Sequence, residues 1–415
     1  MLHLRCKVPP IMRRCSSLFF LLVLAACGSS TPAGSPAPVP PEDAGVDAPA
    51  IACDAYPATP LPLDAAGPDG QIHVIGAAGG DRVFVAYNRP KGSAKTFDVF
   101  LTALRCDGTA AFEPVRVSED DDNDVDPSIA VQGETVLVSW AGDAAGKDPN
   151  LHLRTRLFDR QGGARGAASV FTGPRKGLAN TKGNIWQGSV ASLGDGFALA
   201  GAWGIDEAPA FQTFVSRLDA KGAASGDALD LGLDAGTTQT LVDVASGAAN
   251  AWAAWLVEPN TADGKSVATA SLGATGGLVR GPTLEDATSP TVAALGSAAW
   301  VSAQRGASDV VLQRLDTPGA PIVLAGKGAL PALALSANGG AFASYRAAGA
   351  GRTIVVTRVD GAGAVAAETD LGITDAAPYP LRLVRMVDDV YFLAYQRGKG
   401  SALRGMGRFF DFRTK

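Results

Sequence analysis

The sequence predicts an all-β protein: a seven-bladed β-propeller of four-stranded antiparallel blades, with the last blade completed by an N-terminal strand. Three observations support this prediction: a phrase that occurs seven times, four strand-like segments in each repeat, and a last repeat without its fourth segment. Repetition of a small sheet is typical of ring-shaped and linear repeat folds. The 50 glycines and only 4 methionines argue against a helical protein.

The repeated phrase is an apolar run ending in an aromatic residue, a variable loop, and a second run that usually ends in Asp. We place the first ends at Tyr87, Trp140, Trp203, Trp255, Ala303 (the exception), Tyr345 and Tyr395. The second ends are Asp107, Asp159, Asp219, Gly273, Asp316, Asp360 and Asp411. Asp caps its own turn and a following Gly accepts positive φ, so this pattern needs no chemical role. We interpret the aromatics as packing between blades, although such a ring can also stack on a sugar.

One repeat shows the strands of a blade clearly. Its strands are expected at 126–131, 135–140, 151–158 and 168–171, with tight turns at 132–134 and 159–162. The same order recurs at 331–335, 340–345, 353–359 and from 365 onward. Four antiparallel strands in about 50 residues make one propeller blade.

The two ends of the repeat region complement each other. The last repeat reaches its third strand at 404–410, and the sequence ends at Lys415. Residues 58–64 precede the first full repeat and resemble the fourth strand at 112–118. We therefore expect 58–64 to complete the last blade and cover its exposed edge. A solenoid needs no such complement, so we favour the ring over a solenoid or two β-sandwiches.

Residues 1–26 have the pattern of a processing signal. Arg13 and Arg14 precede the apolar stretch 18–26, which is shorter than the roughly 20 residues that span a bilayer. The run Leu24-Ala25-Ala26-Cys27 resembles the lipobox of bacterial lipoproteins. The resemblance implies that Cys27 carries the lipid, and Gly28 in place of Asp implies sorting to the outer membrane. An ordinary secretory signal with an incidental cysteine is the alternative.

Residues 27–56 are predicted to be a lipidated cysteine and a flexible tether, and 57–415 the propeller domain. The tether is rich in Pro, Ala and Ser and has too few bulky apolar residues to fold. The full chain has a net charge of −5, and removing 1–26 takes away basic residues but no acidic ones. An acidic surface argues against nucleic acid as a partner.

Cys53 and Cys106 are the cysteines that remain after lipidation and removal of the signal. Two thiols in an oxidising compartment favour one disulfide. The repeat pattern argues the other way, because Cys53-Asp54 and Cys106-Asp107 hold equivalent places in neighbouring repeats, too far apart for a bridge. Both alternatives stay open.

The two faces of a propeller differ in their connections. Turns between strands one and two, and between three and four, lie on what we call the short-turn face. The opposite, long-loop face carries the other connections, with long segments at 88–97, 118–127, 141–150, 173–187 and 256–266. Function tends to lie on variable loops of a rigid scaffold, so we expect a ligand on the long-loop face.

Trp186 falls in the predicted loop 173–187 with Arg175, Lys176 and Lys182. It interrupts the regular aromatic spacing, so we predict that these four residues bind a ligand. A loop tryptophan that fills a gap is the alternative.

The acidic segment 119–126 is a candidate metal site. Asp122, Asp124 and Asp126 alternate as in several calcium loops, and Ca²⁺ takes six to eight oxygen ligands. The glycine that lets such loops fold back is missing, and a charge run is commonly a solvated loop. Calcium is the one cofactor that the sequence points to.

Signs of catalysis are few, and no catalytic residue is assigned. His73 and His152 fall inside predicted strands, where we expect them to be packed. The sequence contains no zinc-protease, nucleophile-elbow or phosphate-loop motif. Carboxylate pairs such as Asp206–Glu207 suit glycoside hydrolysis only at the right separation, which a sequence does not show.

Together, the lipobox within 12–27 and the repeats within 57–415 resemble secreted bacterial propeller lipoproteins. The resemblance implies architecture and anchoring but no activity. We expect a monomer in the bacterial cell envelope, on the outer membrane, that touches the membrane through its lipid anchor only. It would bind a protein or glycan through its long-loop face. The alternative is a carbohydrate-active enzyme, a glycoside hydrolase or lyase, with carboxylates on that face.

Overall fold

The computed structural model describes residues 56–65, 67–68, 70–92, 96–120, 123–144, 148–171, 185–204, 211–231, 237–259, 264–348, 351–373, 380–399 and 402–413. Contacts divide the chain into Met1–Glu42, which lies outside the described residues, and Asp43–Lys415, which holds the sheets. The predicted signal 1–26 and nearly all of the tether therefore also lie outside the described residues.

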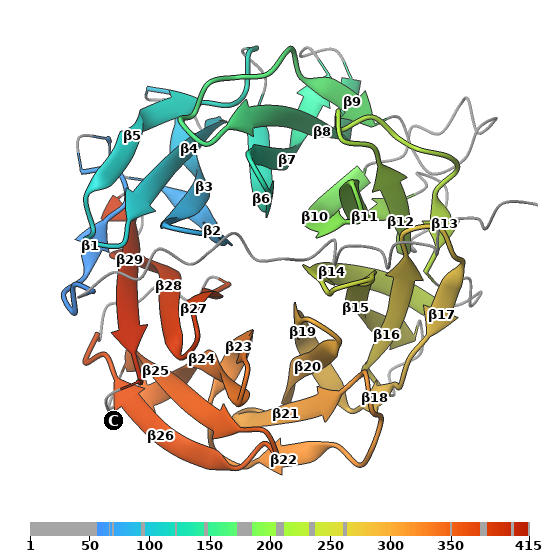
Figure 1. Ribbon diagram of the computed structural model, residues 1–415, viewed down its shortest axis with the longest axis vertical. Helices are drawn as coiled ribbons and strands as arrows, with labels where there is room; N and C mark the ends of the chain where they lie inside the picture. The colour runs from blue at the N-terminus through green and yellow to red at the C-terminus, as the bar shows by residue number, and fades with distance from the viewer. Residues whose placement is uncertain are drawn as a thin grey trace, which may run out of the picture. The chain divides into compact units, whose positions relative to one another are not determined.

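Seven antiparallel sheets surround a central axis, as Figure 1 shows. In each sheet the first strand lies next to the axis and the following strands succeed one another outward. The predicted seven-bladed β-propeller is confirmed. Within the described residues, no helix is long and apolar enough to cross a membrane.

The first three blades have four strands each. Blade one contains β2 (Ile72–Gly79), β3 (Arg82–Pro90), β4 (Phe97–Arg105) and β5 (Ala110–Arg116). Blade two contains β6 (Asp124–Gln132), β7 (Thr135–Ala144), β8 (Asp148–Asp159) and β9 (Ser169–Phe171). Blade three contains β10 (Ile185–Leu193), β11 (Gly196–Gly204), β12 (Phe211–Leu218) and β13 (Leu229–Asp230).

The next three blades repeat this order, with one small addition in blade four. Blade four contains β14 (Thr237–Ser246), β15 (Asn250–Pro259), β16 (Ser266–Gly273), β17 (Leu278–Arg280) and the extra β18 (Leu284–Glu285), which pairs with β16. Blade five contains β19 (Ala287–Leu295), β20 (Ala298–Arg305), β21 (Asp309–Arg314) and β22 (Ile322–Leu324). Blade six contains β23 (Ala329–Ser336), β24 (Gly339–Ala348), β25 (Gly351–Asp360) and β26 (Val365–Asp370).

Blade seven takes its outermost strand from the N-terminal part of the chain. It contains β27 (Arg382–Val387), β28 (Val390–Arg397) and β29 (Arg404–Asp411), followed by β1 (Leu61–Pro62). Leu61 pairs with Gly407 in antiparallel register, and the Leu63 N–H donates to the Gly405 carbonyl at 3.1 Å. The closure predicted for 58–64 is confirmed. Proline within β1 suits an edge strand, because it has no N–H to offer a further strand.

The strands between two neighbours are buried on both faces, which explains their continuous apolar runs. In β11, for example, every residue except the last is buried. The core lies between blades rather than within them. One cluster joins Ile75 and Phe84 of blade one to Ile129 and Trp140 of blade two.

The strands extend further than the apolar runs indicated. The predicted loop 118–127 shrinks because β6 already begins at Asp124, and β7 continues to Ala144 into the predicted loop 141–150. Backbone pairing continues where side chains turn polar, because the ladder needs only N–H and C=O groups. The long-loop face is therefore built partly from strand ends.

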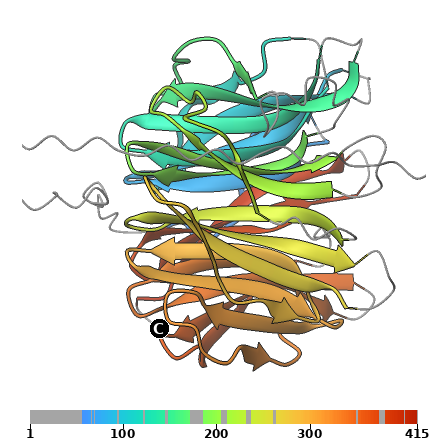
Figure 2. The ribbon, with the colours of Figure 1, turned by 90° about the vertical axis from the view of Figure 1, so that its right-hand side faces the viewer.

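The repeated Asp residues form the turns expected of them. Asp159 accepts the N–H groups of Gln161 and Gly163 at 2.9 and 2.7 Å, and Gly162 has a φ of 82°. Asp360 repeats this arrangement on the N–H groups of Ala362 and Ala364. These turns lie on one side of the ring, and Figure 2 shows the strands running between the two faces.

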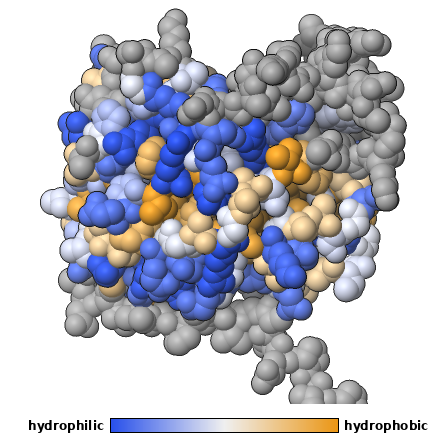
Figure 3. Space-filling view, turned by 90° about the horizontal axis from the view of Figure 1, so that it is seen from above, coloured by the Kyte–Doolittle hydropathy of each residue, from blue (hydrophilic) through white to orange (hydrophobic). Residues whose placement is uncertain are grey.

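The outer rim carries single exposed apolar residues. Figure 3 shows hydrophilic and hydrophobic residues intermixed on the part of the rim that it faces. Exposed valines lie one to a blade on outermost strands: Val170, Val279, Val323 and Val365. Scattered exposure of this kind is normal for a soluble surface.

Candidate functional site

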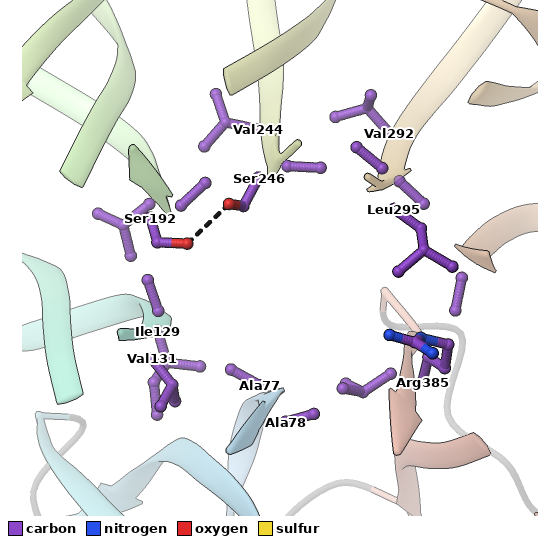
Figure 4. A pocket seen from close by; sticks show the side chains of 18 of the residues that line it. Ala77, Ala78, Ile129, Val131, Ser192, Val244, Ser246, Val292, Leu295 and Arg385 are labelled. Atoms are coloured by element: carbon purple, nitrogen blue, oxygen red, sulfur yellow. Dashed lines mark hydrogen bonds between the residues drawn. The ribbon is translucent and has the colours of Figure 1, made fainter. Parts of the chain in front are cut away.

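The innermost strands enclose a channel along the axis. Each pairs on one side only, so its other edge faces the channel. A cavity of about 640 Å³ lies within it, a size typical of small-molecule sites. From each innermost strand the lining extends toward the short turn (Figure 4), and it begins at Ile75, Ser128, Ser189, Asp243, Thr291, Ala332 and Arg382 in blades one to seven.

A bulge recurs in the innermost strands. In six of the seven, as the structure describes them, the pairing with the second strand shifts by one residue near the long-loop end. The residues at positive φ in these bulges are His73, Asp126, Leu241, Ser289 and Leu330. Bulges re-aim side chains, and here they separate the channel mouth on the long-loop face from the cavity.

The first residue after the bulge links one blade to the next. Ser128, Ser189 and Asp243 occupy this place in blades two, three and four. Their side-chain oxygens accept the N–H groups of Val190, Val244 and Val292, at 3.0, 3.2 and 3.0 Å. Side chains thus satisfy backbone donors that the open strand edges leave unpaired.

Asp243 also joins opposite sides of the ring. Its Oδ1 accepts the Ser189 hydroxyl at 3.1 Å and lies 3.0 Å from Nη1 of Arg382, which comes from β27 of blade seven. Only 7% of the Asp243 side chain is exposed. A carboxylate this deep needs a cation and several donors to offset its lost hydration, and it has both.

On the long-loop face, Asp98 of β4 collects cationic partners. Lys91 Nζ lies 3.0 Å and Arg116 Nη2 2.7 Å from its Oδ1, which also accepts the Ser118 hydroxyl at 3.1 Å. Three donors on one carboxylate link Lys91, just after β3, to Arg116 and Ser118 at the start of the connection to blade two.

Two arginines of β8 hold that same connection from the other side. Arg154 pairs with Asp120 and Arg156 with Glu119. Arg156 also donates to the Val117 carbonyl at 2.9 Å. Residues 117–120, which begin the connection between blades one and two, are therefore bound by charged groups from both blades.

Asp124 is the most perturbed carboxyl of this region. It has no exposed surface, accepts Trp140 Nε1 at 2.8 Å, and its backbone carbonyl accepts Asn88 Nδ2 at 2.6 Å. Burial, and next the charge of Asp120, raises the pKa of Asp124 to about 7, although Trp140 and Lys91 act in the opposite direction. Near neutral pH this carboxyl is therefore only partly ionised.

His73 and Asp126 meet at the channel mouth. They hold the bulge positions of blades one and two, and His73 Nδ1 contacts Asp126 Oδ1. About a quarter of each side chain is exposed, 29% for His73 and 21% for Asp126. The prediction that His73 lies in a strand is confirmed, but its ring is partly exposed and paired with a carboxylate.

The structure separates two of the predicted calcium ligands. Asp124 accepts a hydrogen bond from Trp140, whereas Asp126 contacts His73. Asp122 lies outside the described residues. The described part of the chain contains no group of three or more His, Cys, Asp or Glu side chains placed to hold a metal ion. Calcium binding by the whole segment stays a prediction.

Trp186 belongs to a strand rather than to the predicted loop. Its backbone pairs with Ala202 at the start of β10, since the strand begins at Ile185. The other three members of the predicted site, Arg175, Lys176 and Lys182, lie outside the described residues. Ligand binding by this set stays a prediction.

The structure leaves two predictions about cysteines untested, the lipidation of Cys27 and the disulfide between Cys53 and Cys106. Cys27, the predicted lipidation site, and Cys53 both lie there. Cys106 is disulfide-bonded, and every other cysteine of the chain lies outside the described residues. The pairing of Cys106 with Cys53 therefore stays a prediction.

The aromatic residues are packing elements, as interpreted. Two of them, however, do not hold the position in the second strand that the other aromatics hold. All six are at most 4% exposed. The place beside the bulge is held by Gly201 in blade three and Ser344 in blade six, instead of Trp203 and Tyr345. A Cβ on Gly201 would lie 3.0 Å from Leu153 and Phe214, so those side chains fill the space.

Sequence reasoning missed Asp243 and Arg382. They are 139 residues apart and meet only because the ring closes. One signal was available: Ser128, Thr291 and Ala332 each follow a proline that lies in the bulge, and these small residues mark the level at which the blades are linked. Nothing in that pattern indicates a partner across the axis.

Comparisons with known proteins extend to the fold alone. No protein-family model matches this chain, and no curated protein matches it either. A protein of unknown function from Dyadobacter fermentans DSM 18053 is similar in structure, with a TM-score of 0.51, 11% identity, and coverage of 84% of this chain and 97% of that one. A Hadza microbial sialidase has a TM-score of 0.49, 8% identity, and coverage of 80% and 76%. The α-L-arabinanase of Penicillium chrysogenum has a TM-score of 0.47 and 9% identity, and the match covers 85% of this chain and 98% of the arabinanase. At such identities the similarity concerns the β-propeller architecture.

Proposed function

We propose that this protein is a lipid-anchored β-propeller of the bacterial cell envelope that binds a protein or glycan through its long-loop face. The observation that carries the proposal is the charged network between blades one and two. Asp98, Arg116 and Arg154 hold residues 118–120, the start of the connecting segment, in place before any ligand arrives. A surface ordered in advance loses less conformational entropy on binding, which favours affinity.

The two faces differ in the way expected of a binding module. Turns on the short-turn face are closed by their own Asp residues, as at Asp159 and Asp360, and offer few variable side chains. On the long-loop face, Lys91, Arg154 and Arg156 alternate with carboxylates within a small area. Mixed charge of this kind suits the polar groups of a glycan or a protein surface.

The test compares two arginines of blade two on opposite faces. Arg154→Met removes a cation from the network, whereas Arg165→Met removes an exposed one, bonded to the Thr135 hydroxyl, from the short-turn side. The full-length proteins are used to capture glycans from an array and proteins from envelope extracts. We expect Arg154→Met to lose the captured ligand and Arg165→Met to retain it. Equal capture by the two variants would contradict the assignment of the face.

The lipid anchor rests on the lipobox 24–27 and the adjoining tether. Metabolic labelling with an azide-bearing fatty acid, in a bacterial host, tests it. We expect the full-length protein to take up the label and fractionate with the outer membrane, and Cys27→Ala to lose both properties. Labelling of the Cys27→Ala variant would refute this anchor site.

A second candidate function is that of a carbohydrate-active enzyme, either a glycoside hydrolase or a lyase. It is favoured by a specific observation: Asp98 and Asp124 both lie within 4.0 Å of Lys91 Nζ, and burial together with the charge of Asp120 raises the pKa of Asp124 to about 7. An acid that holds its proton at neutral pH suits general acid catalysis.

A panel of chromogenic glycosides and polysaccharides tests this candidate. Turnover that disappears in Asp124→Asn would support an enzyme using this group of carboxylates. The pair Asp206 and Glu207 lies outside the described residues, and Asp206→Asn serves as the parallel variant. An inactive wild-type protein across the panel would leave binding as the function.

A further inference from the structure

We propose that Cys106 forms its disulfide with Cys53, and that this bond fixes the start of the N-terminal segment to blade one, so that movements of the tether do not unpair β1. The proposed tether supplies only the source of these movements. The bond itself is inferred from the short closing strand, the contacts of the N-terminal segment and the bonded state of Cys106.

The closing strand is held by few backbone contacts. β1 forms two ladder pairs with β29, and the Leu63 N–H adds a hydrogen bond to the Gly405 carbonyl at 3.1 Å. The ends of a chain fray unless they are tied down. If β1 unpaired, blade seven would lose its fourth strand and the edge of β29 would be exposed. A covalent bond just before β1 would oppose this loss.

The N-terminal segment lies along the junction between blades seven and one. The Tyr56 ring packs on Phe409 of β29, with 5.4 Å between the ring centroids. A Cβ on Gly108 would lie 2.9 Å from both Pro57 and Leu61, so these side chains pack on the Gly108 backbone. Tyr56 and Leu61 also pack against the apolar cluster that joins the two blades. The segment therefore contacts the turn between β4 and β5 before it enters β1.

That turn of blade one carries Cys106. This cysteine lies two residues before Gly108, is partly exposed, and is disulfide-bonded. The Gly108 N–H donates to the Arg105 carbonyl at 2.9 Å, and Asp107 Oδ1 accepts the Thr109 N–H at 2.8 Å. Cys106 is therefore held beside the N-terminal segment by a closed turn.

Chain length favours Cys53 as its partner. Cys53 lies three residues before Tyr56, a separation that spans at most about 10 Å. Cys27 lies 29 residues before Tyr56, and the remaining cysteines are further away. The probability that two chain positions meet falls roughly as the −3/2 power of the number of residues between them, which favours Cys53 over Cys27 about thirtyfold. Equivalent turns of neighbouring blades would be too far apart for a disulfide, but Pro57 already contacts the turn of blade one.

The bond changes the path by which a pull on the tether enters the fold. Forming it removes two electrons and two protons from the two thiols, and a disulfide oxidant of the envelope accepts them and becomes a dithiol. The closed loop contains β1 and the first three strands of blade one. A pull that arrives along the tether therefore passes from Cys53 to Cys106 and does not act on β1.

Peptide mapping identifies the pairing. Full-length protein from an oxidising envelope is alkylated without reduction and digested with trypsin and a Glu-specific protease. Cleavage after Glu42 separates Cys27 from Cys53. Cleavage after Arg105 separates Cys53 from Cys106. We expect a linked pair of peptides that contain Cys53 and Cys106. An alkylated Cys106, or Cys106 linked to Cys27, would overturn the proposal.

Hydrogen–deuterium exchange at 61–63 and 405–407 measures the unpairing of β1. Cys53→Ser and Cys106→Ser should each raise the exchange rate there about tenfold or more, because a native disulfide contributes at least that factor to an equilibrium constant. The double variant should raise it no further, because all three variants lack the same bond. Adding a reductant to the folded wild-type protein should have the same effect, which provides a measurement even where a variant does not fold.

Cys27→Ala is the matched control, because it removes a cysteine and the proposed lipid but leaves the bond. Exchange in this variant should equal that of the wild type. The proposal is overturned if Cys53→Ser and the reduced wild type exchange like the untreated wild type, if the effects of the two single variants add, or if Cys27→Ala has the same effect. None of these results depends on whether Cys27 takes up a fatty acid, so failure of the anchor and failure of the disulfide are distinguishable.

Discussion

Blades one and two bury the polar tips of their central aromatic side chains against carboxylates, whereas blade four buries its indole without one. Tyr87 donates to Asp64 at 2.9 Å, and Trp140 donates to Asp124 at 2.8 Å. Trp255 occupies the same place in blade four, and its Nε1 has no hydrogen-bond partner within the described part of the chain. Arg280 instead lies over the Trp255 ring, 5.3 Å from its centroid.

The difference shows which side chains of the repeat the fold needs for packing and which it does not need. A large flat side chain beside the bulge is enough for packing, since Trp255 does without a partner. The buried carboxylates of blades one and two are additions that cost desolvation and are not needed by the fold. They lie at the end of the molecule where the charged connections of the long-loop face begin, which is where we propose that a ligand binds.

The largest effect is expected from removing the indoles. Trp140→Ala and Trp255→Ala should each lower the free energy of unfolding by about 3–5 kcal/mol, because both side chains are fully buried. Trp140→Ala should cost roughly 1–3 kcal/mol more, because it leaves Asp124 without its donor. Denaturant unfolding at pH 7 measures both. A greater loss for Trp255→Ala would break the comparison.

Of the two blades compared, blade two should contribute a pH dependence of stability through Asp124. The folded protein holds the Asp124 proton up to about pH 7, whereas the unfolded chain releases it near pH 4. The folded state therefore binds more protons between these values, and the stability contributed by Asp124 is lost as pH rises through that window. The change amounts to about 4 kcal/mol at most.

Asp124→Asn isolates this contribution. The variant should show a flatter dependence of unfolding free energy on pH between 4 and 8 than the wild type, with the two curves approaching each other as pH falls, because a protonated Asp and an Asn are both neutral. Identical curves would mean that the Asp124 carboxyl titrates normally, and the raised pKa would be wrong.

A smaller effect sharpens the contrast between the two indoles. Trp140→Phe keeps a ring but removes the donor to Asp124, and should cost about 1–3 kcal/mol beyond the change in ring size. Trp255→Phe removes an N–H that has no partner within the described residues, so no such cost is added. Equal losses in denaturant unfolding would show that the hydrogen bond to Asp124 contributes nothing.

The smallest effect concerns the cation over the Trp255 ring. Arg280 is exposed, so Arg280→Met should lower stability by only about 0.5–1 kcal/mol, as for other exposed cation–π contacts. The thermal midpoint of unfolding is a suitable readout. A loss above about 2 kcal/mol would mean that Arg280 compensates for the missing carboxylate more fully than this account allows.

The sequence predicted the ring and its closure because both depend on local patterns. Short strand-like runs, Asp-capped turns and the additional N-terminal segment 58–64 can be recognised without knowing any long-range contact. Strand β1 lies where this pattern predicted it. The exact place of each aromatic was not readable, since an apolar run does not show which of its residues lies opposite the bulge of the neighbouring strand. Trp203 and Tyr345 were misplaced for this reason.

The candidate site was less predictable than the fold. The acidic segment 119–126 was recognised, yet its residues divide among Arg154, Trp140 and His73, partners contributed by three other strands. The Asp243–Arg382 pair depends on which blades face each other across the axis, and only ring closure decides that. Side chains that meet across a ring leave no spacing signal in the chain.

Hydrogen–deuterium exchange tests the central claim, that the long-loop face of blades one and two binds the ligand, most directly. The full-length protein is measured alone and with the ligand recovered by capture. The account predicts slower exchange at 97–99, 117–120 and 152–156, around the network of Asp98, Asp120 and Arg154. Protection confined to 132–135 and 159–165, on the short-turn side of the same blade, would contradict it.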